Sequence, residues 1–361
     1  MESAGALAPR RRPGGAGGGS AARHHDRPPA RAECRPVSAY IIRRLLYAIP
    51  ILIGVNLITF VLFFVVNSPD DMARMQLGDK RVTAEAIQAW KADHGYDRPL
   101  LYNAQAEGTD KLTDTIFFEK SLKLFAFDFG TSDSGRDIGY DIRQRMWPSL
   151  AIALPVLLVG LAINISYALM IVFFRATYID VGSVVLLVAM MSISGLFYII
   201  GGQFLVGKLF HLVPISGYDT GLDAFKFLIL PVIVGVVGGI GTGTRLYRTF
   251  FLEEANRDYV RTARAKGLRE RIVLFRHVLK NALIPILTGV VAVLPLLFMG
   301  ALITESFFGI PGLGSYTIDA INRQDFAIVR AMVFLGSVLY ILGLILTDIS
   351  YTMVDPRVRL S

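Results

Sequence analysis

The residues of this sequence that could do chemistry are two serine–glycine pairs and one cysteine. Ser194-Gly195 and Ser216-Gly217 could supply the nucleophile of a membrane serine protease, but neither serine has a glycine two residues before it. No histidine lies in a later apolar segment, so a general base for either serine is missing. Cys34 is the only cysteine, which excludes an intrachain disulfide and a multi-cysteine metal site. We therefore predict no catalytic residue, no metal site and no cofactor.

Nucleotide chemistry by the chain itself is also excluded. The sequence contains no G-x-x-x-x-G-K-[ST] pattern, the loop that holds phosphates in ATPases. Four glycines do cluster, but they lie inside an apolar segment and do not form a dinucleotide-binding turn. Close packing between helices explains them better; they are Gly238, Gly239, Gly241 and Gly243.

The elements that position any functional residue here are membrane helices. Of the 361 residues, 53% are hydrophobic and 18% are charged, whereas about 25% of a soluble domain is charged. The apolar residues form uninterrupted blocks, and about 20 helical residues cross a hydrocarbon core. The predicted fold is therefore all-α and polytopic, with six transmembrane helices: Leu45–Val66, Pro148–Phe174, Val181–Gly207, Phe227–Thr244, Ala282–Thr304 and Ala331–Thr347.

Composition divides the chain into four regions. Residues 1–36 are rich in glycine and contain no apolar signal-peptide core, so we predict a disordered cytosolic leader. Residues 37–147 hold the first span and an extracytoplasmic region. Residues 148–355 hold the other five spans with a cytosolic loop at 251–281, and residues 356–361 form a cytosolic tail.

The segment between the first two spans is long enough for a small extracytoplasmic subdomain. It covers the 81 residues of Asn67–Trp147. Within it, Thr83–His94 has the pattern of a short amphipathic helix, with Ala86, Ile87 and Trp90 on one side.

Charge indicates the orientation of the spans. The segments on the side of the N-terminus carry 22 Lys/Arg against 10 Asp/Glu, and the loop Arg245–Lys280 alone has ten basic and four acidic residues. Basic loops favour the cytosolic side, so we predict that both termini are cytosolic. The net charge of +8 is thus concentrated on one side of a membrane and does not indicate nucleic-acid binding.

The predicted spans lack charged residues in their central parts, which argues against a carrier driven by an ion gradient. Glu305 and Asp348 lie near span ends, where we expect interfacial water to hydrate them. Neutral polar residues remain, and both pore lining and interhelical hydrogen bonding use such groups. The candidates for a pore are Asn164, Ser166, Ser192 and Ser194, and Asn56 and Gln203 are candidates for interhelical bonds.

A basic loop is the strongest local feature. Asp258–Lys266 is typical of a short basic helix, and Gly267 ends it because glycine readily takes the left-handed conformation. Glu270–Lys280 is a second basic amphipathic stretch. The loop fits a rigid projection that meets a cytosolic partner, or equally a helix resting on anionic headgroups.

The residues of this loop resemble those of permease subunits of ATP-binding-cassette importers, in particular the dipeptide/oligopeptide branch. The family's Glu-Ala-Ala and Ile-x-Leu-Pro positions are occupied here by Arg261-Thr262-Ala263 and His277-Val278-Leu279-Lys280, a departure that the peptide branch shares. The resemblance implies that the loop couples the permease to the ATPase through Tyr259, Val260, Arg261, Thr262, Ala263, Arg264, Ala265, Lys266, Gly267 and Leu268.

Further motifs extend the resemblance over roughly Tyr40–Arg359. They are Tyr40–Leu46, His94–Leu100, Asp128–Ser132, Glu305–Gly314 and Asp355-Pro356-Arg357. Two departures are Gly195, where relatives usually have proline, and the leader, which has no counterpart. Five residues of the late loop would shape an external gate or docking surface, although turn formation explains them equally well: Glu305, Gly309, Pro311, Gly312 and Gly314.

The resemblance implies a type I importer permease fold in a bacterial plasma membrane. The expected partners are a second homologous permease, two cytosolic ATP-binding subunits and an extracytoplasmic solute-binding protein, all acting at a lipid bilayer. The expected cargo is di- or oligopeptide. Other cargo carried by similar permeases, such as nickel chelates or glutathione, is an alternative, and a stand-alone channel or gradient-driven carrier is a second one.

Overall fold

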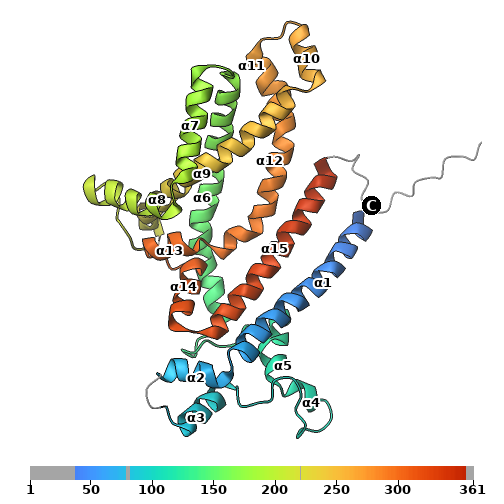
Figure 1. Ribbon diagram of the computed structural model, residues 1–361, viewed down its shortest axis with the longest axis vertical. Coiled ribbons are helices and arrows are strands. Elements are labelled where there is room, and N and C mark those ends of the chain that lie inside the picture. The colour runs from blue at the N-terminus through green and yellow to red at the C-terminus, as the bar shows by residue number, and fades with distance from the viewer. Residues whose placement is uncertain (1–36, 79–81, 220, 355–361) are drawn as a thin grey trace, which may run out of the picture.

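The structure is a computed structural model, and Figure 1 shows its arrangement of helices. It describes residues 37–78, 82–219 and 221–354. Several sequence predictions lie outside these described residues: the leader 1–36 with Cys34, the tail 356–361 and the motif Asp355-Pro356-Arg357.

The described part of the chain is helical and contains no β-strand, only an isolated bridge between Thr131 and Asp137. Five helices are long and apolar enough to cross a membrane, and a bent pair of helices makes up a sixth candidate. This agrees with the predicted all-α polytopic fold. The five spans are Ile42–Val66, Ile138–Phe173, Ala224–Ala255, Glu270–Met299 and Phe326–Ser350.

These spans are built from named helices and short irregular turns of helix. The first comprises α1 (Val37–Val61) and η1 (Leu62–Val66), the second is α6 (Ile138–Phe173) and the fourth is α9 (Ala224–Ala255), which η4 (Gly221–Asp223) precedes. The last is α15 (Phe326–Val354). The fifth joins four elements: α11 (Glu270–Ile272), η5 (Val273–Val278), α12 (Leu279–Val293) and η6 (Leu294–Met299).

The predicted third span, Val181–Gly207, is not one straight helix. It consists of α7 (Tyr178–Ser192) and α8 (Gly195–Gly202), which η3 (Gln203–Leu209) continues, and the two halves meet at 89°. Ile193 and Ser194 are extended between them. The break occurs without proline, since Gly195 has little helix propensity and begins the second half.

Several predicted span boundaries moved, among them the end of the fourth span, from Thr244 to Ala255, and the start of the fifth, from Ala282 to Glu270. Two further changes have different physical reasons. The second span begins ten residues earlier than Pro148, because α6 continues past the apolar block through a charged turn. Hydropathy detects only the part of a helix that lies in lipid. The fifth span ends at Met299 and not at Thr304, since Gly300 takes φ +74° and a separate helix, α13 (Leu302–Phe308), follows.

The segment between the first two spans folds into short helices at the end of the molecule opposite to α10 (Figure 1). The predicted amphipathic helix is present as α3, with Thr83 capping its N-terminus and Gly95 in the left-handed conformation at its end. An apolar cluster that includes Phe60, Phe64 and Tyr96 joins the segment to α1. The helices are α2 (Pro69–Leu77), α3 (Ala84–His94), α4 (Asp110–Thr113), α5 (Ile116–Lys120) and η2 (Leu122–Ala126).

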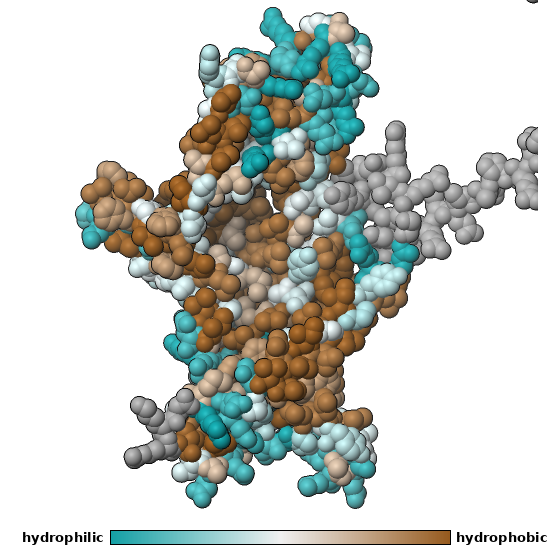
Figure 2. All heavy atoms as spheres, in the orientation of Figure 1, coloured by the Kyte–Doolittle hydropathy of each residue, from teal (hydrophilic) through white to brown (hydrophobic). Residues whose placement is uncertain are grey.

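Two of the four glycines of the predicted cluster allow α9 to pack closely on its neighbours, whereas a Cβ on Gly239 would meet no atom within 4 Å. A Cβ atom on Gly241 would stand 2.8 Å from Met191 Cγ of α7, and a Cβ on Gly243 would overlap Asn164 of α6. Figure 2 shows apolar side chains over the middle of the molecule and hydrophilic ones at both ends. That distribution is the one expected of a protein that lies across a bilayer.

Candidate functional site

The connection between α9 and α12 forms the end of the molecule, where α10 (Asp258–Ala265) and α11 project beyond the other helices (Figure 1). Asp258 lies in the first turn of α10, where an acidic side chain favours the helix dipole. After α10, Gly267 takes φ +76° and its N–H donates to Arg264 O at 2.9 Å. The predicted arrangement of helix, glycine and second helix is therefore present.

One face of α10 is fixed to the membrane helices. Val260 is fully buried and Ala263 nearly so. Both belong to one apolar cluster with side chains from α6, α9, η5 and α12: Ala168, Leu169, Val172, Phe251, Ala255, Val273, Leu274, Val278, Ala282 and Ile286. The inner face of α10 is consequently packed against three spans.

The opposite face of α10 is open. The side chain of Arg261 is 72% exposed. Of the ten residues predicted to contact an ATPase, Val260 and Ala263 point inward, whereas the rest are exposed: Tyr259, Arg261, Thr262, Arg264, Ala265, Lys266, Gly267 and Leu268. This open face carries three basic side chains in a short helix and its following turn.

Polar contacts hold the projection in shape. Arg264 spans the turn at Gly267 and donates to both carboxylate oxygens of Glu270, from Nη2 at 2.6 Å and from Nε at 3.1 Å. Tyr259 donates to Glu254 at 2.5 Å, which ties α10 to the end of α9. Burial raises the pKa of Tyr259, so its hydroxyl remains a donor at neutral pH.

A second site lies in the loop predicted as an external gate. Glu305 is completely buried in α13, so the expectation that interfacial water hydrates it is wrong. Its carboxylate accepts hydrogen bonds from the N–H groups of Ala301, at 3.0 Å, and Ser315, at 3.1 Å. Burial raises the pKa of Glu305, and the hydroxyl of Ser149 in α6 opposes that rise.

The glycines of this loop surround the Glu305 carboxylate. A Cβ atom on Gly300 or Gly312 would overlap it, and a Cβ on Gly314 would stand 2.9 Å from Oε2 and 2.7 Å from Leu302 N. Gly309 has φ +65°, a conformation that favours glycine. Pro311 is exposed at the start of α14 (Leu313–Arg323). The five predicted residues thus lie in α13, in the first turn of α14 and in the short connection between these helices.

The predicted pore residues separate into two groups. Asn164 is buried and accepts a hydrogen bond from Thr244 at 2.9 Å, which joins α6 to α9. Ser166 is exposed on α6. Ser192 and Ser194 lie at the break between α7 and α8 and border an apolar groove of about 860 Å³ that also includes Tyr198 and Leu230.

The other predicted polar residues also make contacts between elements. Asn56 donates to Ser121 O at 3.1 Å, which connects α1 to the segment beside it, and Gln203 donates to Phe307 O at 3.0 Å. Asp348 pairs with Arg44 at 2.6 Å and ties α15 to α1. The bonds of Asn56 and Gln203 are contacts between elements of the kind that the sequence predicted, whereas Asp348 was expected to be hydrated by interfacial water and forms an ion pair instead.

Sequence reasoning missed three residues that the structure makes prominent. Ser149 accepts a hydrogen bond from Leu313 N at 2.8 Å and so anchors the start of α14 to α6. Arg248 of α9 pairs with Asp180 of α7 at 2.8 Å. Arg330 is 4% exposed in the first turn of α15, although it lies just before the predicted sixth span. The position of Arg330 as a single charged residue directly before an apolar block was the sequence signal that could have indicated its importance.

Two family comparisons match most of the chain. Residues 167–360 match the family described as binding-protein-dependent transport system inner membrane component, and residues 37–108 match the family of N-terminal parts of such membrane components. No group of three or more His, Cys, Asp or Glu residues that could hold a metal occurs in the described part of the chain.

Individual relatives are similar over nearly their whole length. The oligopeptide transport system permease protein AppB of Bacillus subtilis (strain 168) is 29% identical over 90% of this chain and 100% of its own. The dipeptide transport system permease protein DppB of Escherichia coli (strain K12) is 28% identical over 89% and 98%. A provisionally named peptide transport system permease of Brucella abortus (strain 2308) is 30% identical over 90% and 99%.

Proposed function

The chain belongs to the family of binding-protein-dependent transport system inner membrane components, and we propose that it is the membrane-spanning subunit of an ATP-driven importer of di- and oligopeptides. It is a multi-pass protein of a bacterial inner membrane. Membership of the family and the peptide permeases named among its relatives support the proposed cargo. Nickel chelates and glutathione are the alternative cargo, which the identity of the binding protein decides.

We place α10 in the cytosol, together with both termini, and the helices α2 to α5 outside the cell. The basic residues of the α9–α12 connection support this orientation. On the cytosolic side, the open face of α10 would lie in a groove of an ATP-binding subunit. The observation that carries this role is the division of α10 into one buried and one exposed face.

The packing of α10 explains how ATP-driven motion would reach the transport path. Closure of two ATPases displaces α10, and the cluster around Val260 passes this displacement to α6, α9 and α12. Such a change is a rigid-body shift between two packings, which the ligand on each side favours differently. The transport path of the membrane-spanning chain then opens alternately to the two sides of the membrane, although the chain itself does not hydrolyse ATP.

A second permease subunit would complete the transport path. The apolar groove beside Ser192 and Tyr198 is lined in part by the exposed ring of Phe197. Large exposed apolar surfaces on the spans are suited to contact with lipid. A groove with hydroxyl groups at its edge is better suited to packing against a neighbouring helix. This supports a pore shared between two subunits.

The proposal is tested by reconstitution into liposomes. The chain with its second permease, both ATPases and the binding protein should accumulate radiolabelled dialanine only when ATP is supplied to the ATPases. Omission of any one partner should abolish accumulation. ATP-independent flux through the purified chain alone would overturn the proposal in favour of a channel or gradient-driven carrier, and transport restricted to a nickel chelate or glutathione would overturn the peptide cargo.

A further inference from the structure

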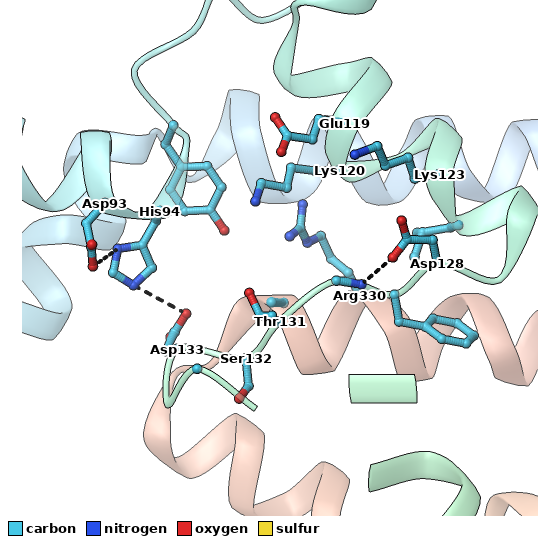
Figure 3. A pocket seen from close by; sticks show the side chains of 16 residues that line it. Asp93, His94, Glu119, Lys120, Lys123, Asp128, Thr131, Ser132, Asp133 and Arg330 are labelled. Atoms are coloured by element: carbon cyan, nitrogen blue, oxygen red, sulfur yellow. Dashed lines mark hydrogen bonds and ion pairs between the residues drawn. The ribbon is translucent and has the colours of Figure 1, made fainter. Parts of the chain in front are cut away.

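A polar pocket of about 380 Å³ lies between the α2–α5 segment and the first turn of α15. This volume is within the usual range of small-molecule sites, about 300–1,000 Å³. Figure 3 shows the charged side chains around it, with Lys120 and Arg330 directed toward the same central space. None of the predicted site residues lies in this pocket.

The guanidinium of Arg330 is buried and forms no ion pair with a carboxylate of the described residues. Its Nε donates to Phe326 O at 3.3 Å, and its Cζ lies 4.6 Å from the centre of the Phe64 ring. Its Nη1, however, has no hydrogen-bond partner among the described residues. A buried charge of this kind is unfavourable unless it is paired, and arginine cannot lose its proton to avoid the cost.

Lys120 adds a second cation to the same space. It is half-buried, its Nζ lies 5.5 Å from the centre of the Tyr96 ring, and it forms no ion pair with a carboxylate within the described ranges. Burial lowers the pKa of Lys120, and the charge of Arg330 acts in the same direction. Lys123 lines the outer part of the pocket. An anion between these groups would relieve their repulsion and their desolvation.

The carboxylates of the pocket already have partners. Glu119 pairs with Arg98, and Asp128 accepts from Gly130 N at 3.1 Å. Asp93 and Asp133 each lie 3.7 Å from a ring nitrogen of His94, one on either side. Lys120, Lys123 and Arg330 form no ion pair with a carboxylate among the described residues, although the lining contains acids as well.

We propose that this pocket binds a carboxylate, held by the guanidinium of Arg330 and the ammonium of Lys120. Guanidinium and ammonium donors give short, charge-assisted hydrogen bonds to carboxylates. Two sources share this chemistry on the outer side of the membrane: the C-terminus of a free short peptide and an acidic side chain of the solute-binding protein. The choice of these two sources rests on the proposed function. The observation of the unpaired cations does not.

The chain contains a natural reporter for the pocket. Trp90 stacks on His94 at 4.2 Å and contacts Tyr96 at 5.5 Å between ring centres, and both of these residues line the pocket. The chain has two tryptophans, so Trp147→Phe leaves Trp90 as the only one. Titrations would use the full chain with this substitution in phosphatidylcholine nanodiscs.

Dialanine should change the Trp90 fluorescence saturably, and dialanine amide, which lacks the carboxylate, should bind at least about tenfold more weakly. Lys120→Gln should weaken dialanine by a similar factor, while Lys120→Arg retains it. Arg74→Gln is the matched control, because Arg74 is exposed on α2 outside the pocket. Lys120 is the test position since the buried Arg330 cannot be replaced without disturbing the fold.

A second measurement separates the two sources. If the carboxylate belongs to the binding protein, dialanine gives no signal, but the affinity of the purified binding protein for the nanodisc-held permease falls about tenfold in Lys120→Gln. Equal titration by dialanine and its amide, or no effect of Lys120→Gln in either assay, would overturn the site. Such a failure leaves the uptake of dialanine by the wild-type transporter intact, whereas failure of the proposed function abolishes that uptake.

Discussion

The Glu305 carboxylate occupies the space that a side chain on Gly312 would need. A Cβ atom on Gly312 would overlap the carboxylate and would stand 2.5 Å from the hydroxyl of Ser149. The glycine is thus required by a close approach and not by its backbone conformation. This contact joins α6 to the turn between α13 and α14.

Gly312→Ala should therefore destabilise the protein. Overpacking of a well-packed site costs about 1–3 kcal/mol, and here a Cβ would force both the Glu305 carboxylate and the Ser149 hydroxyl out of their hydrogen bonds. The measurement is the thermal unfolding midpoint of the purified chain. Gly160→Ala is the control, because a Cβ on Gly160 meets no atom within 4 Å; equal midpoints for the two variants would contradict the steric argument.

Gly267 is required for its backbone conformation alone. It has φ +76°, and a Cβ there meets no atom within 4 Å. A left-handed conformation costs a β-carbon-bearing residue about 1–2 kcal/mol, and asparagine tolerates it best. Gly267→Val should raise the ATP hydrolysed per dialanine imported by the reconstituted transporter, while Gly267→Asn should resemble the wild type. Unchanged stoichiometry in Gly267→Val would show that this turn does not contribute to coupling.

The Arg264–Glu270 pair should contribute little to global stability. Both side chains are more than a third exposed, and exposed pairs are worth about 0.2–1 kcal/mol. Arg264→Gln should lower the unfolding midpoint slightly at low salt and hardly at all in 1 M salt, which screens the attraction. The exchanged pair Arg264→Glu with Glu270→Arg should recover part of the loss. A large, salt-independent drop would mean that Arg264 acts mainly through packing.

Asp133 should make stability depend on pH. Burial and the repulsion of Asp325 raise the pKa of Asp133, despite hydrogen bonding by Gln76 and attraction to His94. The folded state then holds this proton more tightly than the unfolded state, in which the aspartate has a pKa of about 4. Stability contributed by the protonated form is therefore lost as the pH rises from about 4 through the raised pKa, and it stays lost above it.

Asp133→Asn should flatten this dependence, with a higher unfolding midpoint at neutral pH than the wild type and a smaller difference near pH 4. Asp93→Asn is the matched control, since Asp93 faces the same histidine but its side chain is 84% exposed. A flat profile in the wild type, or the same change in both variants, would contradict the assigned cause.

The local features of this protein were predictable from its sequence. Blocks of about 20 apolar residues predict spans because lipid satisfies no backbone hydrogen bond. The basic helix that ends at Gly267 and the capped helix after Thr83 depend on neighbouring residues in the chain, and the structure contains both. The 89° break at Ser194 was not predicted, because an apolar block has the same hydropathy whether it is straight or bent.

Contacts between distant residues were decided only by the tertiary structure. Glu305 appeared to lie at a hydrated span end, yet Ser149 and the turn before α14 enclose it. Lys120 and Arg330 belong to different helices far apart in the chain, and neither has a local pattern that brings it to the other. The sequence by itself determined which segments enter the membrane and which loop projects from it. The packing of those segments decided which charges are buried and which of them lack a partner, since burial depends on what folds over a residue and not on its neighbours in the chain.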